Sequence, residues 1–272
     1  MTWLEYFALP AMNWSRLQVL DESPKHFRHA LQNEREDSDT LAIGRYVHTA
    51  TLEPERIGTD FAIWDGARRS GVDWKAFAAA NADKTILRAA DLKEANAMAA
   101  AVRAHPDVAA LLSDHSTVVE STIQWFDAES TTPCKGRPDI RNKRRRILAD
   151  LKTSKSTDLR RFVNDVVRYK YPGQAAFYAE GIAQAEGWTP TDHILIVVEK
   201  AAPYDVAIFP MDADTIEIGR SQFRALLTKL RECTDSGNWP GRHPKPVELN
   251  ASNLPPWFYG GGVPEFAFES EM

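Results

Sequence analysis

Hydrophobic positions in the first part of the chain recur with helical spacing. Ser23-Pro24 suits a helix start, because serine caps the first turn and proline fits its first position. Glu53-Pro54 suits a helix end, since proline disfavours a helical residue before it. The pattern predicts two short helices within 13–35 and further helices over 38–52, 72–81 and 91–104. We therefore expect residues 1–112 to form a mainly helical N-terminal part.

The pattern changes to strand-like alternation after residue 112. Strands are predicted over 117–126, 134–141 and 146–153, with a turn at 127–133 and a hairpin tip at 142–145. Helical spacing then predicts helices over 158–169 and 173–186. A pair of strands is predicted over 192–199 and 204–210, followed by a long helix over 212–234. The order predicts one α/β domain over 1–272, with its core at 113–234 and an irregular tail at 235–272.

The stretch GRPDIRNKRRRILADLKTSKS, residues 136–156, carries candidate chemistry. Asp150 and Lys152 are two apart on a predicted strand, so they share one face, and Leu151 points to the other. Asp139 precedes Asp150 by eleven residues across a short hairpin, a spacing that can bring both carboxylates together. Two close carboxylates repel unless a cation lies between them, and Mg²⁺ fits that need. Lys152 could then orient or deprotonate a water, whereas the simpler alternative is a surface ion pair.

A second pattern lies in YPGQAAFYAEG, residues 171–181. Gln174 and Tyr178 are four apart on a predicted helix and so lie on one face. Such a pair is often only helix surface. Because it follows the D-x-K strand by about twenty residues, we interpret it as part of the same site, where it could contact a phosphate and brace Lys152.

The charge distribution is uneven. The chain has 33 Lys and Arg against 38 Asp and Glu, a net charge of −5, which alone argues against a nucleic-acid binder. Residues 135–170 hold thirteen Lys and Arg against four Asp, so this segment carries +9 and the remainder −14. A focused basic segment suits an anion site. The cations 143–146 taken alone could equally be a solvated hairpin.

Cysteine content and hydropathy exclude several classes of protein. Cys134 and Cys233 are the only cysteines, which excludes a disulfide framework and a four-cysteine zinc or iron–sulfur site within one chain. There is no apolar run of about 18 residues, so no transmembrane helix is predicted. The N-terminal residues lack the basic and apolar regions of a secretory signal. We expect a cytoplasmic protein, because a reducing compartment is the default for a chain with two cysteines.

These motifs resemble the RecE-type exonucleases, in the RecB-like branch of the PD-(D/E)XK nuclease superfamily. The matching motifs are Gly136 to Asp139, Asp150 to Thr153 and Gln174 to Tyr178, together with SPKHFR at 23–28, GRYVHTATLEPE at 44–55, VEKAAPYDV at 198–206 and NWPG at 238–241. The resemblance extends over most of the chain. It implies a restriction-endonuclease-like core, in which helices flank a mixed central sheet, with a helical N-terminal portion.

The resemblance also implies roles for individual residues. Asp139, Asp150, His48 and the carbonyl of Leu151 match metal ligands, and Lys152 matches the catalytic lysine. Gln174 and Tyr178 match the family's Q-x-x-x-Y element. Without the resemblance, His48 reads as a core or helix-surface histidine. Glu120 is a lesser candidate for the metal site, and an exposed strand residue opposite a basic partner is the alternative.

The implied activity is degradation of one strand of linear duplex DNA from its 5′ end, which leaves 3′ single-stranded tails. One or two Mg²⁺ ions, with Mn²⁺ as the alternative, would serve catalysis. Basic residues would hold the DNA backbone without reading sequence: Arg137, Lys143, Arg144, Arg145, Arg146, Lys155, Arg160 and Arg161. The family implies a homo-oligomeric ring, a tetramer in its best-known case, and a single-strand annealing protein as partner in phage recombination. It also implies the cytoplasm of a bacterium or phage-infected cell.

Two other functions remain open from the sequence. An endonuclease with the same site would cut a closed circle. A non-catalytic DNA-binding relative would keep the fold, although an intact set of Asp139, Asp150 and Lys152 argues against it.

Overall fold

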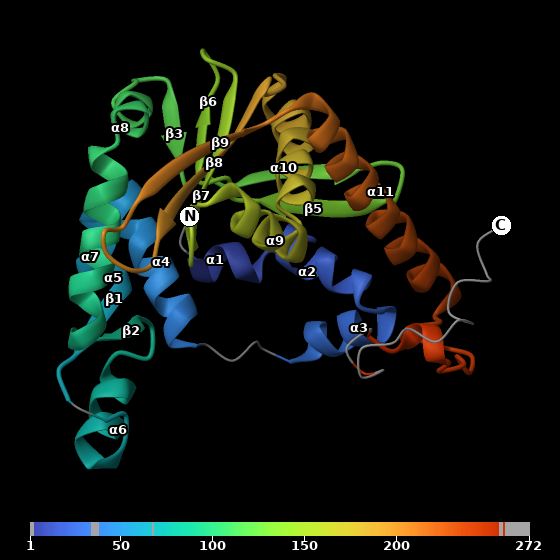
Figure 1. Ribbon diagram of the computed structural model, residues 1–272, viewed down its shortest axis with the longest axis horizontal. Coiled ribbons are helices and arrows are strands. Elements are labelled where there is room, and N and C mark those ends of the chain that lie inside the picture. The colour runs from blue at the N-terminus through green and yellow to red at the C-terminus, as the bar shows by residue number, and fades with distance from the viewer. Residues whose placement is uncertain (1–2, 34–37, 67, 256–257, 259–272) are drawn as a thin grey trace.

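A five-stranded mixed sheet forms the centre of the computed structural model, which describes residues 3–33, 38–66, 68–255 and 258 (Figure 1). Its strand order is β3-β6-β7-β8-β9, in which β7 and β8 are parallel and the other neighbours antiparallel. The strands are β3 (Thr117–Val119), β6 (Ile140–Asn142), β7 (Ile147–Ser154), β8 (Asp192–Glu199) and β9 (Val206–Met211). This sheet with helices on both sides confirms the predicted α/β class.

Helices cover both faces of the sheet. In Figure 1, α4 and α7 lie on one side, and α10 and α11 lie on the other. The helices are α1 (Trp3–Ala8), α2 (Trp14–Leu17), α3 (Pro24–Gln32), α4 (Asp39–Leu52), α5 (Ile57–Asp60), α6 (Gly71–Ala80), α7 (Ala89–Ala104), α8 (Pro106–Leu112), α9 (Leu159–Tyr169), α10 (Tyr171–Glu186) and α11 (Ala213–Ser236). The crossover from β7 to the parallel β8 runs through α9 and α10, as a parallel pair requires.

The side chains of β7 divide between the two cores. Leu148 packs with α10 and α11, whereas Ile147, Ala149 and Leu151 pack with α4 and α7. Both faces are covered, so most of the strand is buried. This alternation is the predicted one, and it puts Asp150 and Lys152 on the α10 side of the sheet.

Several predicted helix boundaries are confirmed. The Ser23 hydroxyl accepts a hydrogen bond from the His26 amide at 3.2 Å, which caps α3. Helix α4 ends at Leu52, two residues before Pro54. The long helix predicted at 212–234 is α11, which Asp212 caps through the Thr215 amide.

Two predicted strands were wrong in their extent. The strand expected over 117–126 is β3 followed by a separate strand, β4 (Ile123–Asp127), with a break at Glu120, whose φ is +44°. The strand expected over 134–141 is β5 (Thr132–Gly136) and then β6. Strands β4 and β5 pair as a hairpin outside the central sheet, and a parallel bridge joins Cys134 of β5 to Met12. Because of these breaks, Glu120 and Asp139 lie outside the strands, directly after β3 and directly before β6.

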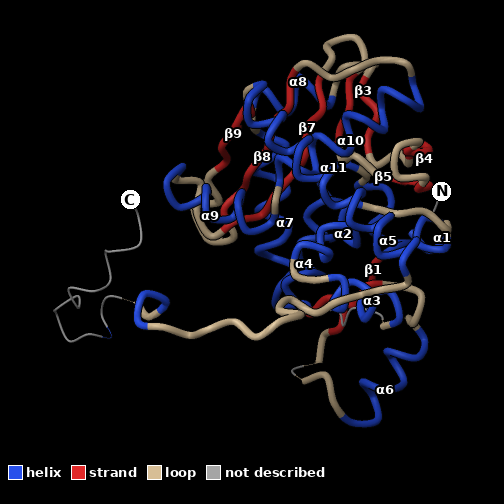
Figure 2. Tube along the Cα trace, turned by 90° about the vertical axis from the view of Figure 1, so that its right-hand side faces the viewer, coloured by secondary structure: helices blue, strands red, loops and turns tan. Residues whose placement is uncertain are grey.

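Five of these helices and strands were not predicted. Helices α1, α5 and α8 are short, and the parallel strands β1 (Phe61–Trp64) and β2 (Thr85–Arg88) have only four residues each. Such segments are too short for a clear period. Helix α6 lies between these strands in sequence and at the far edge of the molecule in Figures 1 and 2.

The N-terminal helix is attached to β5 by a buried lysine. Lys135 is fully buried, and its ammonium donates to the carbonyls of Tyr6 at 2.6 Å and Leu9 at 2.8 Å. Burial of the charge lowers the pKa of Lys135. These bonds hold α1 beside the strand that leads to Asp139.

Among the described residues, none of the helices combines the length and apolarity that a membrane crossing requires. The predicted tail is irregular from 237 to 250 and has one 3₁₀ turn at Ala251–Asn253. The rest of that tail, at 256–257 and 259–272, lies outside the described residues.

Candidate active site

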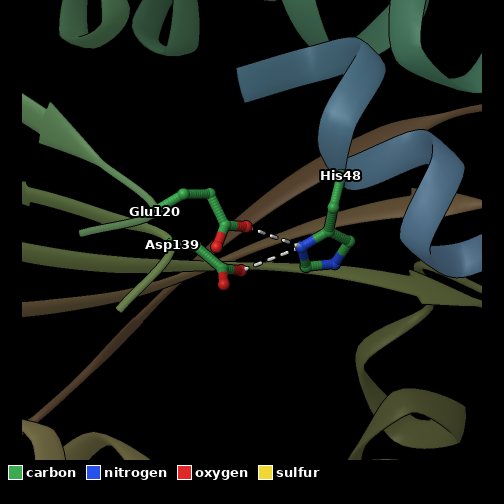
Figure 3. A group of neighbouring side chains, drawn as sticks. All are labelled: His48, Glu120 and Asp139. Carbon is green, nitrogen blue, oxygen red and sulfur yellow. Dashed lines mark ion pairs between the residues drawn. The ribbon is translucent and has the colours of Figure 1, made fainter. Parts of the chain in front are cut away.

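Three potential metal ligands converge where α4 faces the edge of the central sheet (Figure 3). His48 comes from α4, Glu120 follows β3, and Asp139 precedes β6. Nδ1 of His48 lies 3.4 Å from Oδ2 of Asp139 and 3.9 Å from Oε1 of Glu120. One ligand atom from each residue lies within 4.8 Å of the other two. The structure thus brings together three residues that are far apart in sequence.

Glu120 reaches this group because the backbone turns at that residue. Its φ of +44° is in the left-handed region, which a non-glycine residue adopts only at a cost. Its amide donates to the carbonyl of Asp139 at 3.0 Å, so the turn is bonded to the partner it faces. Glu120 is 9% exposed and is therefore a buried site residue rather than an exposed strand residue.

Asp139 is fixed to β7 by a backbone hydrogen bond. Its Oδ2 accepts from the amide of Leu151 at 2.7 Å. Strand β6 pairs with β7 only as far as Ala149, so this edge of β7 is open at Leu151. The amide and carbonyl of one strand residue point to the same edge. The Leu151 carbonyl therefore faces the carboxylates.

Lys152 lies among groups from β7 and α10. Its ammonium contacts Asp150 and donates to Oε1 of Gln174 at 3.1 Å, and Gln174 in turn donates to the Tyr178 hydroxyl at 3.4 Å. The ring of Tyr171 lies 4.7 Å from Nζ of Lys152. The predicted chain from the lysine through Gln174 to Tyr178 is present. Tyr171 was missed, since one tyrosine at a helix start has no distinguishing spacing.

The site contains three carboxylates against one imidazole and one ammonium group. Burial lowers the pKa of His48, but the charges of Asp139 and Glu120 outweigh burial and raise it to about 9. Burial and the charge of Asp150 raise the pKa of Asp139 to about 7. The pKa of Lys152 is also raised, because Asp150 and Asp139 outweigh its burial. The carboxylates therefore favour positive charge on the imidazole and on the ammonium group.

The donor set fits a divalent metal ion. Both oxygens of Asp150 are buried and accept no well-formed hydrogen bond from the described residues, although the Lys152 ammonium touches one of them. Buried carboxylate oxygens without donors are costly unless a cation balances them. Carboxylates, a carbonyl and an imidazole are ligands for Mg²⁺ or Mn²⁺, and the imidazole is the softer donor.

The predicted DNA-contacting residues fall into three groups. Arg137 is buried between Glu120 and Glu53, at 3.0 and 3.6 Å, so its predicted contact with DNA is corrected to an internal ion pair. Lys143, Arg144, Arg145 and Arg146 are exposed at the hairpin tip, where Arg144 pairs with Asp114. Lys155, Arg160 and Arg161 are exposed on the other side of the site. Arg146 directly precedes β7, and Asp150 is the fourth residue of that strand.

A family model described as "PDDEXK-like domain of unknown function (DUF3799)" matches residues 13–246. The crystal structure of a candidate exonuclease from Eubacterium rectale superposes with a TM-score of 0.64 at 16% identity, over 92% of this chain and 95% of that chain. The crystal structure of the protein SSO0001 covers 83% of this chain and 87% of its own at 14% identity, with a TM-score of only 0.32. No curated protein matches.

The Eubacterium rectale structure confirms the fold at an identity too low to carry a function. The family match spans most of the chain and includes every residue described above from the site. It agrees with the sequence Pro138-Asp139 followed by Asp150-Leu151-Lys152, which is the PD-(D/E)XK pattern. The central mixed sheet flanked by helices is the restriction-endonuclease-like core of that superfamily. The chain therefore belongs to the PDDEXK-like family DUF3799.

Proposed function

We propose that this chain is a metal-dependent DNA exonuclease, which removes nucleotides from the 5′ ends of linear duplex DNA and leaves 3′ single-stranded tails. The observation that carries the nuclease proposal is the convergence of Asp139, Asp150 and Lys152 at one open strand edge beside His48 and Glu120. The end requirement and the 5′ polarity rest on the resemblance to RecE-type exonucleases. So do the ring assembly, the annealing partner and a cytoplasmic location.

The metal would be held by His48, Glu120, Asp139, Asp150 and the carbonyl of Leu151. We propose Mg²⁺, with Mn²⁺ as the alternative because an imidazole is among the ligands. When bound, the ion would neutralise charge on the scissile phosphate and favour hydroxide over water.

The chain's own groups then position the reaction. The Lys152 ammonium, held by Asp150 and Gln174, is placed to orient the attacking water and to stabilise negative charge that develops on the phosphate. Water adds to phosphorus, the bond to the 3′ oxygen breaks, and that oxygen leaves and takes up a proton. Asp150 also keeps the lysine protonated, because its charge raises the lysine's pKa.

The test is digestion of a linear duplex labelled at its 5′ ends, next to a closed circular plasmid, with Mg²⁺ or with EDTA. The proposal expects labelled nucleotides from the linear DNA alone and only with the metal. A duplex labelled at the 3′ ends reports the polarity. Cleavage of the circle would replace the exonuclease by an endonuclease, and no cleavage of any DNA with either Mg²⁺ or Mn²⁺ would leave a DNA-binding relative.

A further inference from the structure

Helix α9 follows β7, the strand that carries Asp150 and Lys152, and is fixed to it. The Ser154 hydroxyl, at the end of β7, donates to Oδ2 of Asp165 on α9 at 2.7 Å. Phe162 is 1% exposed and stacks on Phe209 of β9, with ring centroids 5.1 Å apart. Phe162 also contacts Tyr171, whose ring lies against Lys152. The inner side of α9 is therefore part of the packing that supports the catalytic lysine.

The outer side of α9 exposes an apolar stripe. Leu159, Val163 and Val167 are 58%, 45% and 70% exposed. They are four residues apart, so they form one row about 12 Å long. At the end of the helix, Tyr169 is 47% exposed and stacks on Tyr171 with centroids 5.8 Å apart. Tyr169 is two residues after Val167 and therefore lies on the side of α9 that carries Phe162, so this aromatic pair is separate from the row.

Cations border this row. Arg160, Arg161 and Arg168 are exposed and form no ion pair with the described residues. The guanidinium of Arg168 lies 5.5 Å from the centre of the Tyr169 ring. The two acidic groups of this segment are already engaged, Asp158 as the helix cap and Asp165 with Ser154. The outer surface of α9 is therefore positive as well as apolar.

This combination of groups selects a partner. Arginines alone would suit the phosphates of an intact duplex, which shields its bases, so exposed aliphatic side chains would gain nothing there. A strand with unpaired bases offers phosphates and apolar base faces together, and such strands bind on basic surfaces with apolar and aromatic platforms. A second copy of this chain or a lipid surface would also cover apolar residues. Neither of these two partners explains why the helix that carries the row is fixed to β7, the strand of Asp150 and Lys152.

We infer that the outer surface of α9, formed by Leu159, Arg160, Val163, Val167 and Arg168, binds unpaired nucleotides of the DNA strand next to the active site. This inference rests on the proposed nuclease function and adds a substrate preference to it. DNA ends that fray, or that already carry a few unpaired nucleotides, are the preferred substrates. The arginines hold the backbone, while Leu159 and the two valines contact the bases.

The test measures binding in EDTA, where no cleavage occurs. The probes are three fluorescent oligonucleotides: a single strand of about twenty nucleotides, a blunt duplex, and a duplex with unpaired nucleotides at one end. The double substitution Val163→Thr/Val167→Thr keeps side-chain shape and helix propensity but makes the row polar. We expect about tenfold weaker binding of the single strand and the unpaired end, and blunt-duplex binding within about twofold.

Two further variants sharpen the comparison. Ile218→Thr on α11 is the matched control, since Ile218 is 60% exposed on another helix, and it should bind all three probes like the wild type. Arg160→Gln/Arg161→Gln should weaken binding of every probe and lower the salt dependence for the single strand by about 1.4 in log–log slope. Thermal melting monitors folding of each variant.

Unchanged affinity of Val163→Thr/Val167→Thr for the single strand and the unpaired end would overturn the inference. Two other results for this double variant would also overturn the inference if its DNA affinity is unchanged. A smaller molecular mass than the wild type in light scattering would indicate a contact between copies of the chain, and lost binding to vesicles would indicate a lipid surface. Failure of the nuclease proposal is separately visible. Hydrolysis of bis(p-nitrophenyl) phosphate by the wild-type protein with Mn²⁺ tests the catalytic centre without α9, whereas the binding comparison requires no cleavage.

Discussion

Nε of Arg137 donates to Oε2 of Glu120 across 3.0 Å, with the two side chains only 3% and 6% exposed. Arg137 stands directly before the Pro-Asp pair, and Glu120 is one of the three grouped metal-ligand candidates. The arginine therefore orients a carboxylate that would otherwise be repelled by Asp139. This relationship assigns Arg137 a structural role within the site.

Arg137→Gln should weaken metal binding and the fold together. A partner that orients a metal ligand typically changes metal affinity by about 10–100-fold when it is removed. Loss of one member of a buried ion pair costs about 3–5 kcal/mol in the free energy of unfolding. Calorimetric titration with Mn²⁺ and urea denaturation measure the two effects.

The matched control for this variant is Arg141→Gln. Arg141 is also buried and pairs with Glu186 at 2.6 Å, outside the metal-ligand group. The Arg141→Gln variant should have a lower free energy of unfolding than the wild type but the same affinity for Mn²⁺. Equal losses of Mn²⁺ affinity in both variants would mean that Arg137 acts through general stability alone.

Lys152→Ala should reduce DNA cleavage by about a thousandfold or more, since it removes the cation placed to stabilise charge on the phosphate. DNA binding should stay near normal, because one partly buried lysine contributes little to contacts with the backbone. Single-turnover cleavage and fluorescence anisotropy separate the two quantities. Lys229→Ala, at an exposed position on α11, is the control and should cleave normally. Substantial turnover by Lys152→Ala would remove the lysine from the mechanism.

The metal-free protein should lose stability as the pH rises from about 4 to about 9. Folding raises the pKa of Asp139 from 3.8 to about 7, so the folded state binds the extra proton between these values and loses that advantage above them. Folding raises the pKa of His48 from 6.5 to about 9, and its contribution is present below 6.5 and lost as the pH rises through 9.

A bound metal should oppose this trend. Metal ligands must be deprotonated, so the increase in Tm caused by Mn²⁺ should grow with pH over the same range. Thermal melts in EDTA and in Mn²⁺ measure the difference at each pH. His48→Gln should flatten the upper part of the metal-free curve. An Mn²⁺ effect that is constant from pH 5 to 9 would contradict the assignment of these two groups as ligands.

Gly219→Ala should destabilise the fold and disturb the site. A Cβ at Gly219 would lie 2.1 Å from the carbonyl oxygen of Pro172, at the start of α10, so the two helices would have to separate. Overpacking of this kind costs about 1–3 kcal/mol. It should also reduce cleavage, since Gln174 lies two residues after Pro172 and holds Lys152.

Gly44→Ala provides the contrast for this prediction. A Cβ at Gly44 meets nothing within 4 Å, and the residue lies inside α4, so alanine should stabilise the fold by about 1 kcal/mol. If the close contact between α10 and α11 at Gly219 causes the loss, urea denaturation should show a lower free energy of unfolding for Gly219→Ala and a higher one for Gly44→Ala. Equal effects would point to helix propensity instead.

Local signals in the chain were sufficient for many of its elements. Ser23 and Pro24 place the start of α3, Pro54 limits α4, and alternation along 147–153 places Asp150 and Lys152 on one face. These predictions succeeded because each depends on neighbours within one or two helical turns or along one strand. The same locality explains why the four-residue strands β1 and β2 were missed.

The break at Glu120 had no local signal. Val118, Val119 and Ile123 suit a continuous strand, and a glutamate between them reads as an exposed residue. Its left-handed backbone is stabilised by the bond to the Asp139 carbonyl and by Arg137. Arg137 was likewise taken for a DNA contact, because its basic neighbours concealed a buried ion pair.

By itself, the sequence determined the α/β class, most helix boundaries and the identity of the Asp139, Asp150 and Lys152 motif, since periodicity and motif spacing are properties of nearby residues. Only the tertiary structure decided that Glu120 joins His48 and Asp139, that Arg137 faces inward, and that α9 presents an apolar and positive surface. The physical reason is that burial and ion pairing depend on segments far apart in the chain, whose contacts exist only after the sheet and its helices have packed.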